Sequence, residues 1–198
     1  MERALENLRK YPLEERLHLE KICHDELSDL YMLCKDKRAE EQIGQCIDLH
    51  RKWLAMDDRF ERPHRDTTGY MMRAYAKMVY LRDLISRDKL NEYYQKCIGL
   101  ARARGDMAEI YSTSARYYQC TGDYERAVAY IDSTITAYKS KGIKADLAPI
   151  YATQSYLYEK MGDYKNALKA VRTTNNIRFN ERVEEAQSSL AEMQTLFE

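Results

Sequence analysis

Apolar residues recur at helical spacing along most of the chain, separated by short polar breaks. Leu27, Leu30 and Cys34 are three and four residues apart on one such stripe, which predicts a long helix over residues 13–35. By the same pattern, further helices are expected over residues 1–10, 39–56, 69–85, 88–103, 107–120, 124–139, 147–160 and 164–173. The fold class predicted is therefore all-α. The longest polar break, residues 57–68, is the expected joint between two halves of the chain.

One six-residue stretch occurs twice. Gly122-Asp123-Tyr124-Glu125-Arg126-Ala127 recurs as Gly162-Asp163-Tyr164-Lys165-Asn166-Ala167, 40 residues later, counted from position 122 to position 162. The same register pairs residues before each stretch: Tyr111 with Tyr151, Ala115 with Ser155, and Tyr118 with Tyr158. Repetition at this spacing is typical of stacked helix pairs, which usually hold partners rather than catalyse reactions.

Each residue type in the repeat has a physical role in a helix pair. Glycine lets the chain turn between antiparallel helices, aspartate caps the second helix, and alanine allows close approach where helices cross. Tyrosines spaced seven residues apart lie on one helix face. We therefore expect them to fill the space between neighbouring helix pairs. The positions with these structural roles are Tyr111, Ala115, Tyr118, Gly122, Ala127, Tyr151, Tyr158, Gly162 and Ala167.

Composition narrows the function classes. Lys and Arg together number 32, as do Asp and Glu, so the formal net charge is zero. Proteins that bind nucleic acid duplexes usually carry a basic excess, so direct nucleic acid binding is not expected. No apolar run approaches about 18 residues, so no membrane span is predicted in this chain. Only 7 glycines and 3 prolines interrupt it, which favours long helices.

The reactive residue types do not form a catalytic or metal-binding pattern. His18 and His24 are six residues apart and lack the i, i+4 spacing of a helical zinc pair. Cys23 and His24 are adjacent, so on a helix they point apart and cannot act as nucleophile and base. No glycine-rich phosphate loop is present. We therefore predict no catalytic residue, no metal, no cofactor and no enzyme activity.

The repeated unit resembles the tetratricopeptide repeat family. That family places a large aromatic, a small residue and a tyrosine before Gly-Asp-Tyr-x-x-Ala, and residues 107–175 carry this pattern twice. Two departures are the period of 40 instead of 34 and the missing closing proline, where Lys139 and Phe179 stand. The resemblance implies a right-handed α-solenoid of antiparallel helix pairs ending in a long C-terminal helix.

The same resemblance implies a domain organisation and a binding groove. Residues 1–68 would form degenerate helix pairs, and residues 69–178 the repeats, with clear units over about 107–141 and 147–175. Polar residues on the first helix of each pair line the concave groove in this family. The candidates for binding a protein or peptide segment are Tyr70, Arg73, Ser114, Tyr117, Gln154 and Ser155. The alternative is that most tyrosines only pack between helices.

The C-terminal segment, residues 179–198, has a different pattern. Phe179, Val183, Ala186, Leu190, Met193 and Phe197 are spaced 4, 3, 4, 3 and 4 residues apart, which is a heptad-like seam. One hypothesis is a helix that caps the last apolar face of the array. The other is a coiled-coil-like helix, which is either a homodimer seam that would make the protein a structural assembly module or a stalk that leads into further sequence.

A second resemblance concerns the same region. Residues 176–181 and 191–198 are similar to the segment that closes the repeat region of membrane-anchored regulators of the Bacteroidetes. It implies a periplasmic location and a role in signal reception, and without it a cytoplasmic location is expected. The leading functional hypothesis is a non-enzymatic scaffold that binds a protein or peptide, as the sensory part of a signalling or transcriptional regulator.

Overall fold

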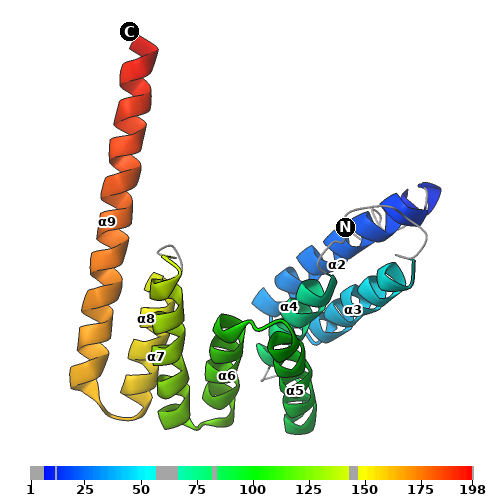
Figure 1. Cartoon of the computed structure of the whole chain (residues 1–198), viewed down its shortest axis with the longest axis horizontal. Coiled ribbons are helices and arrows are strands. Elements are labelled where there is room, and N and C mark those ends of the chain that lie inside the picture. The colour runs from blue at the N-terminus through cyan, green and yellow to red at the C-terminus, as the bar shows by residue number, and fades with distance from the viewer. Residues whose placement is uncertain (1–6, 12, 57–66, 82–83, 143–146, 198) are drawn as a thin grey trace. The chain divides into compact units, whose positions relative to one another are not determined.

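The computed structural model describes residues 7–11, 13–56, 67–81, 84–142 and 147–197. Within these ranges every regular element is a helix, so the predicted all-α class is confirmed. A short 3-10 helix, η1, precedes eight α-helices (Figure 1). Their bounds are η1 Leu8–Lys10, α2 Leu13–Leu33, α3 Arg38–Met56, α4 Thr67–Val79, α5 Arg87–Ala103, α6 Met107–Thr121, α7 Tyr124–Ser140, α8 Leu147–Lys160 and α9 Tyr164–Phe197.

The chain forms two compact units, Met1–Tyr117 and Tyr118–Glu198. In the first unit α2 packs on α3, α3 on α4, and α4 on α5. Its core consists of the apolar stripes of three helices. Ala39, Ile43 and Ile47 of α3 meet residues of α4 and α5 that include Met78 and Cys97. The i, i+4 spacing of the α3 residues, which predicted the helix, also places them in the core.

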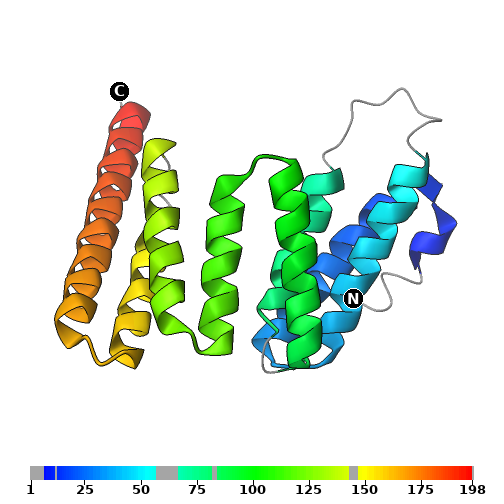
Figure 2. The same ribbon diagram turned by 60° about the horizontal axis from the view of Figure 1, so that its bottom comes forward.

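In the second unit α7 packs on α8 and α8 on α9, with α8 and α9 side by side in both views (Figures 1 and 2). Leu157 of α8 is fully buried, and the small residues Ala167, Ala170 and Thr174 of α9 are buried. These small side chains recur at three- and four-residue spacing and allow close approach of the helix backbones. Ala115 and Ala127, two other predicted packing positions, are also buried.

The turns between helices share one hydrogen-bond pattern. The amides of Asp106, Asp123 and Asp163 each donate to the carbonyl five residues earlier, over 2.9–3.0 Å. A residue with positive φ precedes each aspartate, Gly122 at +84° and Gly162 at +76° among them. This is the Schellman arrangement that ends helices at glycine. Gly122 and Gly162 have positive φ in these turns, and Asp123 and Asp163 cap the following helices.

Three predicted helix bounds were wrong. The helix expected over residues 69–85 ends at Val79, because Leu81 accepts turn hydrogen bonds from Leu84 and Ile85, and Ser86 caps α5. Residues 8–10 form only a 3-10 turn, and residues 1–6 lie outside the described part. The helix expected to stop at residue 173 continues to Phe197, since neither glycine nor proline occurs after Gly162. The predicted joint, residues 57–68, lies mostly outside the described residues and stays a prediction.

Candidate partner-binding surface

Charged residues and tyrosines gather on one face of α2 and α4 in the first unit. On α2 Lys21, Asp25 and Asp29 are four residues apart, so they share a face. On α4 Tyr70 and Arg73 are three residues apart and likewise share a face, with Lys77 one turn further along. Contacts between these side chains join the two rows. We call the rows together the α2–α4 face, which consists of Lys21, Asp25, Asp29, Tyr70, Arg73 and Lys77.

Tyr70 is the centre of the best-defined cluster on this face. Its ring stacks on the His50 ring with centroids 5.1 Å apart and planes 10° apart. Lys21 Nζ lies 4.1 Å from the Tyr70 ring centroid and the Arg73 guanidinium carbon 4.7 Å from it. Cation–π contacts of this length contribute about 0.5–1 kcal/mol each at exposed sites. We call Lys21, His50, Tyr70 and Arg73 the Tyr70 cluster.

The Tyr70 cluster carries two positive charges, and the carboxylates of Asp25 and Glu109 act on it electrostatically. His50 is buried, and this burial, together with the charges of Lys21 and Arg73, lowers its pKa to about 4 against a smaller opposing effect of Asp25. The imidazole is therefore neutral at pH 7. Neither Lys21 nor Arg73 forms an ion pair with any of the residues that the structure describes. The cluster thus offers an aromatic ring and two cations to a negatively charged group.

The middle of the α2–α4 face is an ion-pair bridge. Lys77 Nζ lies 2.6 Å from Asp25 Oδ1 and 2.8 Å from Asp29 Oδ1. Partial burial tends to lower the Lys77 pKa, but its hydrogen bonds to the two carboxylates outweigh that effect and raise it. The bridge therefore stays intact at neutral pH. It fixes α4 against α2, and its two carboxylates form their ion pairs with Lys77.

Beyond the bridge the face ends in an apolar hollow. The Arg116 guanidinium carbon of α6 lies 4.0 Å from the Tyr80 ring centroid, and the Tyr80 side chain is exposed. A hollow of about 420 Å³ adjoins it, lined by Asp29, Met32, Leu33, Lys35, Tyr80, Leu81 and Leu84. Leu33 is 83% exposed, so the hollow has an open apolar rim. The α2–α4 face is therefore cationic and aromatic at one end and apolar at the other.

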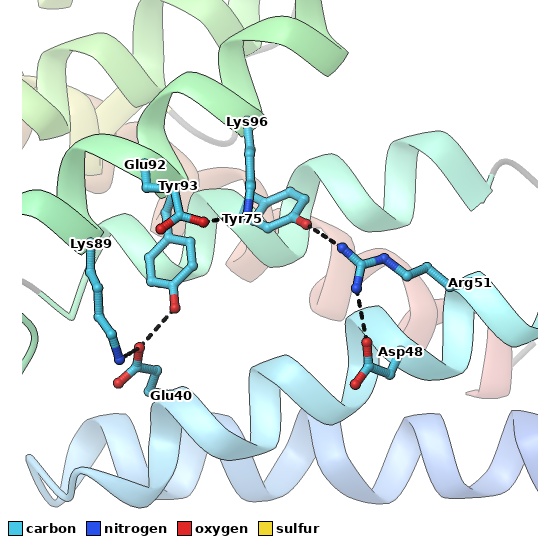
Figure 3. Close-up of polar contacts among 8 residues, drawn as sticks. All are labelled: Glu40, Asp48, Arg51, Tyr75, Lys89, Glu92, Tyr93 and Lys96. Carbon is cyan, nitrogen blue, oxygen red and sulfur yellow. Dashed lines mark hydrogen bonds and ion pairs between the residues drawn. The ribbon is translucent and has the colours of Figure 1, made fainter.

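A second group of polar side chains fastens α3, α4 and α5 together (Figure 3). Glu40 accepts hydrogen bonds from Lys89 Nζ and Tyr93 Oη, both 2.7 Å long. Its partial burial favours a raised pKa, but these two donors prevail and lower it. Arg51 donates to Tyr75 Oη over 3.2 Å and pairs with Asp48. Because these groups are engaged with one another, this region is better suited to hold the helices than to bind a partner.

The structure divides the six predicted groove residues. Tyr70 and Arg73 lie together on the α2–α4 face. Ser114 is buried with its Oγ 3.1 Å from Tyr94 Oη, and Tyr117 stacks on the same Tyr94 ring at 4.0 Å between centroids. The Tyr117 ring therefore contributes to the contact between α5 and α6. Packing between helices was the alternative role expected for most of the tyrosines.

The two predicted groove residues in the second unit are buried as well. Gln154 Nε2 donates to Asp132 Oδ1 over 2.6 Å, and the Ser155 side chain is 4% exposed. The side chains of Ser114, Gln154 and Ser155 are therefore buried in this structure, and their role in a groove stays a prediction. They were selected for polarity, but a polar residue is also compatible with the interior when it has a hydrogen-bond partner.

Tyr111, Tyr151 and Tyr158, three of the structural tyrosines, are partly buried. Tyr118 is also partly buried and stacks on Tyr130 of α7 with centroids 5.5 Å apart. Sequence reasoning missed Lys21, His50, Tyr80 and Arg116 as members of the candidate surface. The four-residue spacing of Lys21, Asp25 and Asp29 was the available signal.

Two of the cysteines, Cys46 and Cys97, are buried in the first unit. Burial raises the pKa of both the Cys46 and Cys97 thiols to about 12, so neither is a thiolate at neutral pH. No three His, Cys, Asp or Glu side chains among the described residues are grouped to hold a metal ion. None of the described helices combines the length and apolar character that a bilayer crossing requires.

The fold of this chain is similar to that of a protein of known structure. No protein-family model matches the sequence, and no curated protein matches it. Among solved structures, the crystal structure of BtubC (BKLC) from P. vanneervenii is similar, with a TM-score of 0.50 and 15% sequence identity. The match covers 91% of this chain and 89% of that chain. At this identity the likeness shows a shared helical fold and nothing about function.

Proposed function

We propose that this chain is a non-enzymatic helical-repeat scaffold that binds a protein or peptide segment along its α2–α4 face. The repeat architecture is supported by the recurring glycine–aspartate turns and by the packing of α2 with α3, α4 with α5, and α8 with α9. A tetratricopeptide-like solenoid of antiparallel helix pairs is the arrangement we infer from these turns and from the sequence repeat. Such arrays commonly present one long face to an extended partner.

The observation that carries this proposal is the Tyr70 cluster. Two cations lie against one aromatic ring, and neither is paired with a carboxylate of the described residues. A partner that supplies an acidic side chain would form a direct ion pair with Lys21 or Arg73. An apolar side chain of the same partner fits the hollow beside Tyr80 and Leu33. The expected partner is therefore an extended segment with an acidic residue at one end and an apolar one at the other.

The test is a selection of binding peptides from a phage-displayed library of random short sequences, followed by isothermal titration calorimetry of the selected peptides. We expect acidic peptides to be enriched and their affinity to fall as salt concentration rises. Tyr70→Ala and Arg73→Gln should each weaken binding about tenfold, the magnitude of one desolvated cation–π or charge contact.

Matched controls are available in the same unit. Tyr11 is an exposed tyrosine outside the face, and Arg102 is an exposed arginine at the end of α5. Tyr11→Ala and Arg102→Gln should leave the affinity unchanged, and circular dichroism should show all four variants folded. Equal binding by the Arg73→Gln and Arg102→Gln variants, or enrichment of basic peptides, would refute the proposed surface.

We also propose that the scaffold is the sensory part of a signalling or transcriptional regulator. This proposal rests on the resemblance of residues 176–181 and 191–198 to the end of the repeat region in membrane-anchored regulators. If it is correct, the coding sequence that follows Glu198 should specify an apolar segment of about 20 residues. Sequencing of the gene beyond that codon decides the matter, and a stop codon there would contradict it.

A further inference from the structure

The last helix, α9, carries an apolar stripe that the rest of the second unit does not cover. Its members are Tyr164, Leu168, Val171, Phe179, Val183, Leu190 and Met193, and all are exposed. Most of the steps between them are three, four or seven residues, the spacing of a heptad seam. Ala167, Ala170 and Thr174, which are buried, lie on a different face of the same helix. We name the exposed residues the outer stripe.

The outer stripe is longer than the seam recognised in the sequence. It includes residues before Phe179, and α9 has 34 residues, which is nearly five heptads and exceeds the three to four that define a coiled coil. Val171 and Phe179 are eight residues apart, one residue more than the seven of a regular heptad. An irregularity of this kind unwinds a coiled coil locally and does not end it.

In the described part of the second unit, the side chains of α9 are exposed from Arg182 to Thr195. At 1.5 Å per residue α9 is about 51 Å long, whereas the 14 residues of α8 span only about 21 Å. Figure 1 shows α9 extending well past the end of α8. Every side chain from Arg182 to Thr195 is exposed, including Leu190 at 57% and Met193 at 49%. A helical segment with an uncovered apolar face is marginally stable in water on its own.

Charge is distributed unevenly along α9. Residues 164–182 contain five basic side chains and one acidic side chain, whereas residues 183–197 contain three acidic side chains and no basic one. The basic residues are Lys165, Lys169, Arg172, Arg178 and Arg182, and the acidic ones in the second half are Glu184, Glu185 and Glu192. Two copies side by side in parallel would align like charges. In the antiparallel orientation, each basic half lies along an acidic half, and because Glu184, Glu185 and Glu192 lie off the outer stripe this is an attraction at longer range than a direct ion pair.

We propose that two copies of this chain associate through the outer stripes of their α9 helices, in antiparallel orientation. The arrangement has two-fold symmetry, so one surface satisfies both copies. With full overlap, the symmetry axis passes between Asn180 and Glu181. Leu168 then lies beside Met193 of the second copy, and Val171 beside Leu190, because the members of each pair are equally distant from the axis.

Light scattering on the full chain after size-exclusion chromatography tests the association. The wild-type protein should have the mass of a dimer. Leu190→Glu and Met193→Glu should each raise the dissociation constant at least about a hundredfold, because each buries a charge in an apolar seam. Both residues are exposed in the single chain, so neither change should affect folding. Gln187→Glu, an exposed position off the outer stripe, is the matched control and should remain dimeric.

Photo-crosslinking distinguishes the two orientations. A benzoylphenylalanine at position 193 should crosslink to the segment around Leu168 in the antiparallel pair, and mass spectrometry of the digest locates the crosslink. A crosslink between the two copies of position 193 would overturn the orientation. A monomeric wild-type protein, or a dimer that survives both glutamate substitutions, would overturn the association itself. These outcomes are independent of peptide binding by the first unit.

Discussion

Lys35 occupies a backbone conformation that the other helix-ending turns give to glycine. Its φ is +52°, and it is the one non-glycine residue with positive φ in the described part of the chain. The amide of Asp36 donates to the carbonyl of Tyr31, five residues earlier, so this turn has the same hydrogen bonds as the glycine–aspartate turns. A side chain in the left-handed region costs about 1–2 kcal/mol. The α2–α3 turn therefore stores strain at one residue.

Replacement of Lys35 by glycine should stabilise the protein. Glycine removes the free-energy cost of the strained backbone from the folded state, but its flexibility also stabilises the unfolded chain. Because the first effect is larger, the free energy of unfolding should rise by about 0.5–1 kcal/mol. Urea denaturation followed by circular dichroism measures this change. Lys35→Ala keeps the strain and should give no such gain. Equal stability of the two variants would show that the turn is not strained.

At Gly162 the reverse change, from glycine to a residue with a side chain, should destabilise the protein. Its φ is +76°, and a Cβ at this position would have no atom within 4 Å, so a side chain is disfavoured by backbone conformation alone. Gly162→Ala should lower the free energy of unfolding by about 1 kcal/mol. The same denaturation experiment tests it, and an unchanged midpoint would contradict the role given to this glycine.

His50 should make stability depend on pH between about 4 and 6.5. Its folded-state pKa is about 4, and its ordinary value is 6.5. The unfolded chain therefore binds a proton in this range that the folded chain does not bind. The stabilising contribution is complete above pH 6.5 and is lost as pH falls toward 4, on the order of 2–3 kcal/mol.

The measurement is urea denaturation of the wild type and of His50→Phe across this range. Phenylalanine keeps a ring against Tyr70 but cannot titrate. Carboxylates titrate in both proteins, so their effect cancels in the difference between the two free energies of unfolding. As pH falls, the wild type should therefore lose more stability than the His50→Phe variant. A constant difference would mean that His50 has an ordinary pKa in the folded protein.

At the scale of helices, close packing depends on small residues at particular positions. Ala127 of α7 is fully buried, whereas Ala129, two residues later, is exposed. Ala127→Leu should lower the free energy of unfolding by about 1–3 kcal/mol, because the larger side chain has no space. Ala129→Leu adds the same atoms on the solvent side and should change it by less than about 0.5 kcal/mol. Thermal and urea denaturation of both variants test the contrast.

The helices themselves could be predicted because their signals are local. Apolar periodicity and the turns at Gly122 and Gly162 depend on residues close together in sequence, and most helix bounds follow from them. Local signals also explain the wrong bounds. Val79 ends α4 although apolar residues continue after it, and α9 was predicted too short because the absence of glycine and proline after Gly162 was not used as a signal that the helix continues.

The candidate surface could be predicted only in part, because its geometry depends on contacts between helices. Tyr70 and Arg73 were found from one helix, but Lys21 and His50 come from α2 and α3. Gln154 was predicted to be a polar groove residue. Its side chain is buried, and its amide donates a hydrogen bond to Asp132 of α7. A single helix does not show which of its polar residues has a partner on the next one.

At the scale of the whole molecule, the chain has two compact units with separate cores. Ile43 is 1% exposed and belongs to the core of the first unit, and Leu157 is fully buried in the second. Truncation of either side chain to alanine should cost about 2–5 kcal/mol within its own core. Because repeat arrays are stabilised mainly by contacts between neighbouring elements, the loss should be concentrated in the unit that carries the substitution.

Hydrogen exchange with mass spectrometry can locate that loss. Ile43→Ala should accelerate amide exchange in α3, α4 and α5, with a smaller change in α8 and the first half of α9. Leu157→Ala should give the reverse distribution. The two variants are matched in kind, since each removes a fully buried aliphatic side chain. If both accelerated exchange equally throughout the chain, the units would unfold as one cooperative body, and their separate cores would have no energetic consequence.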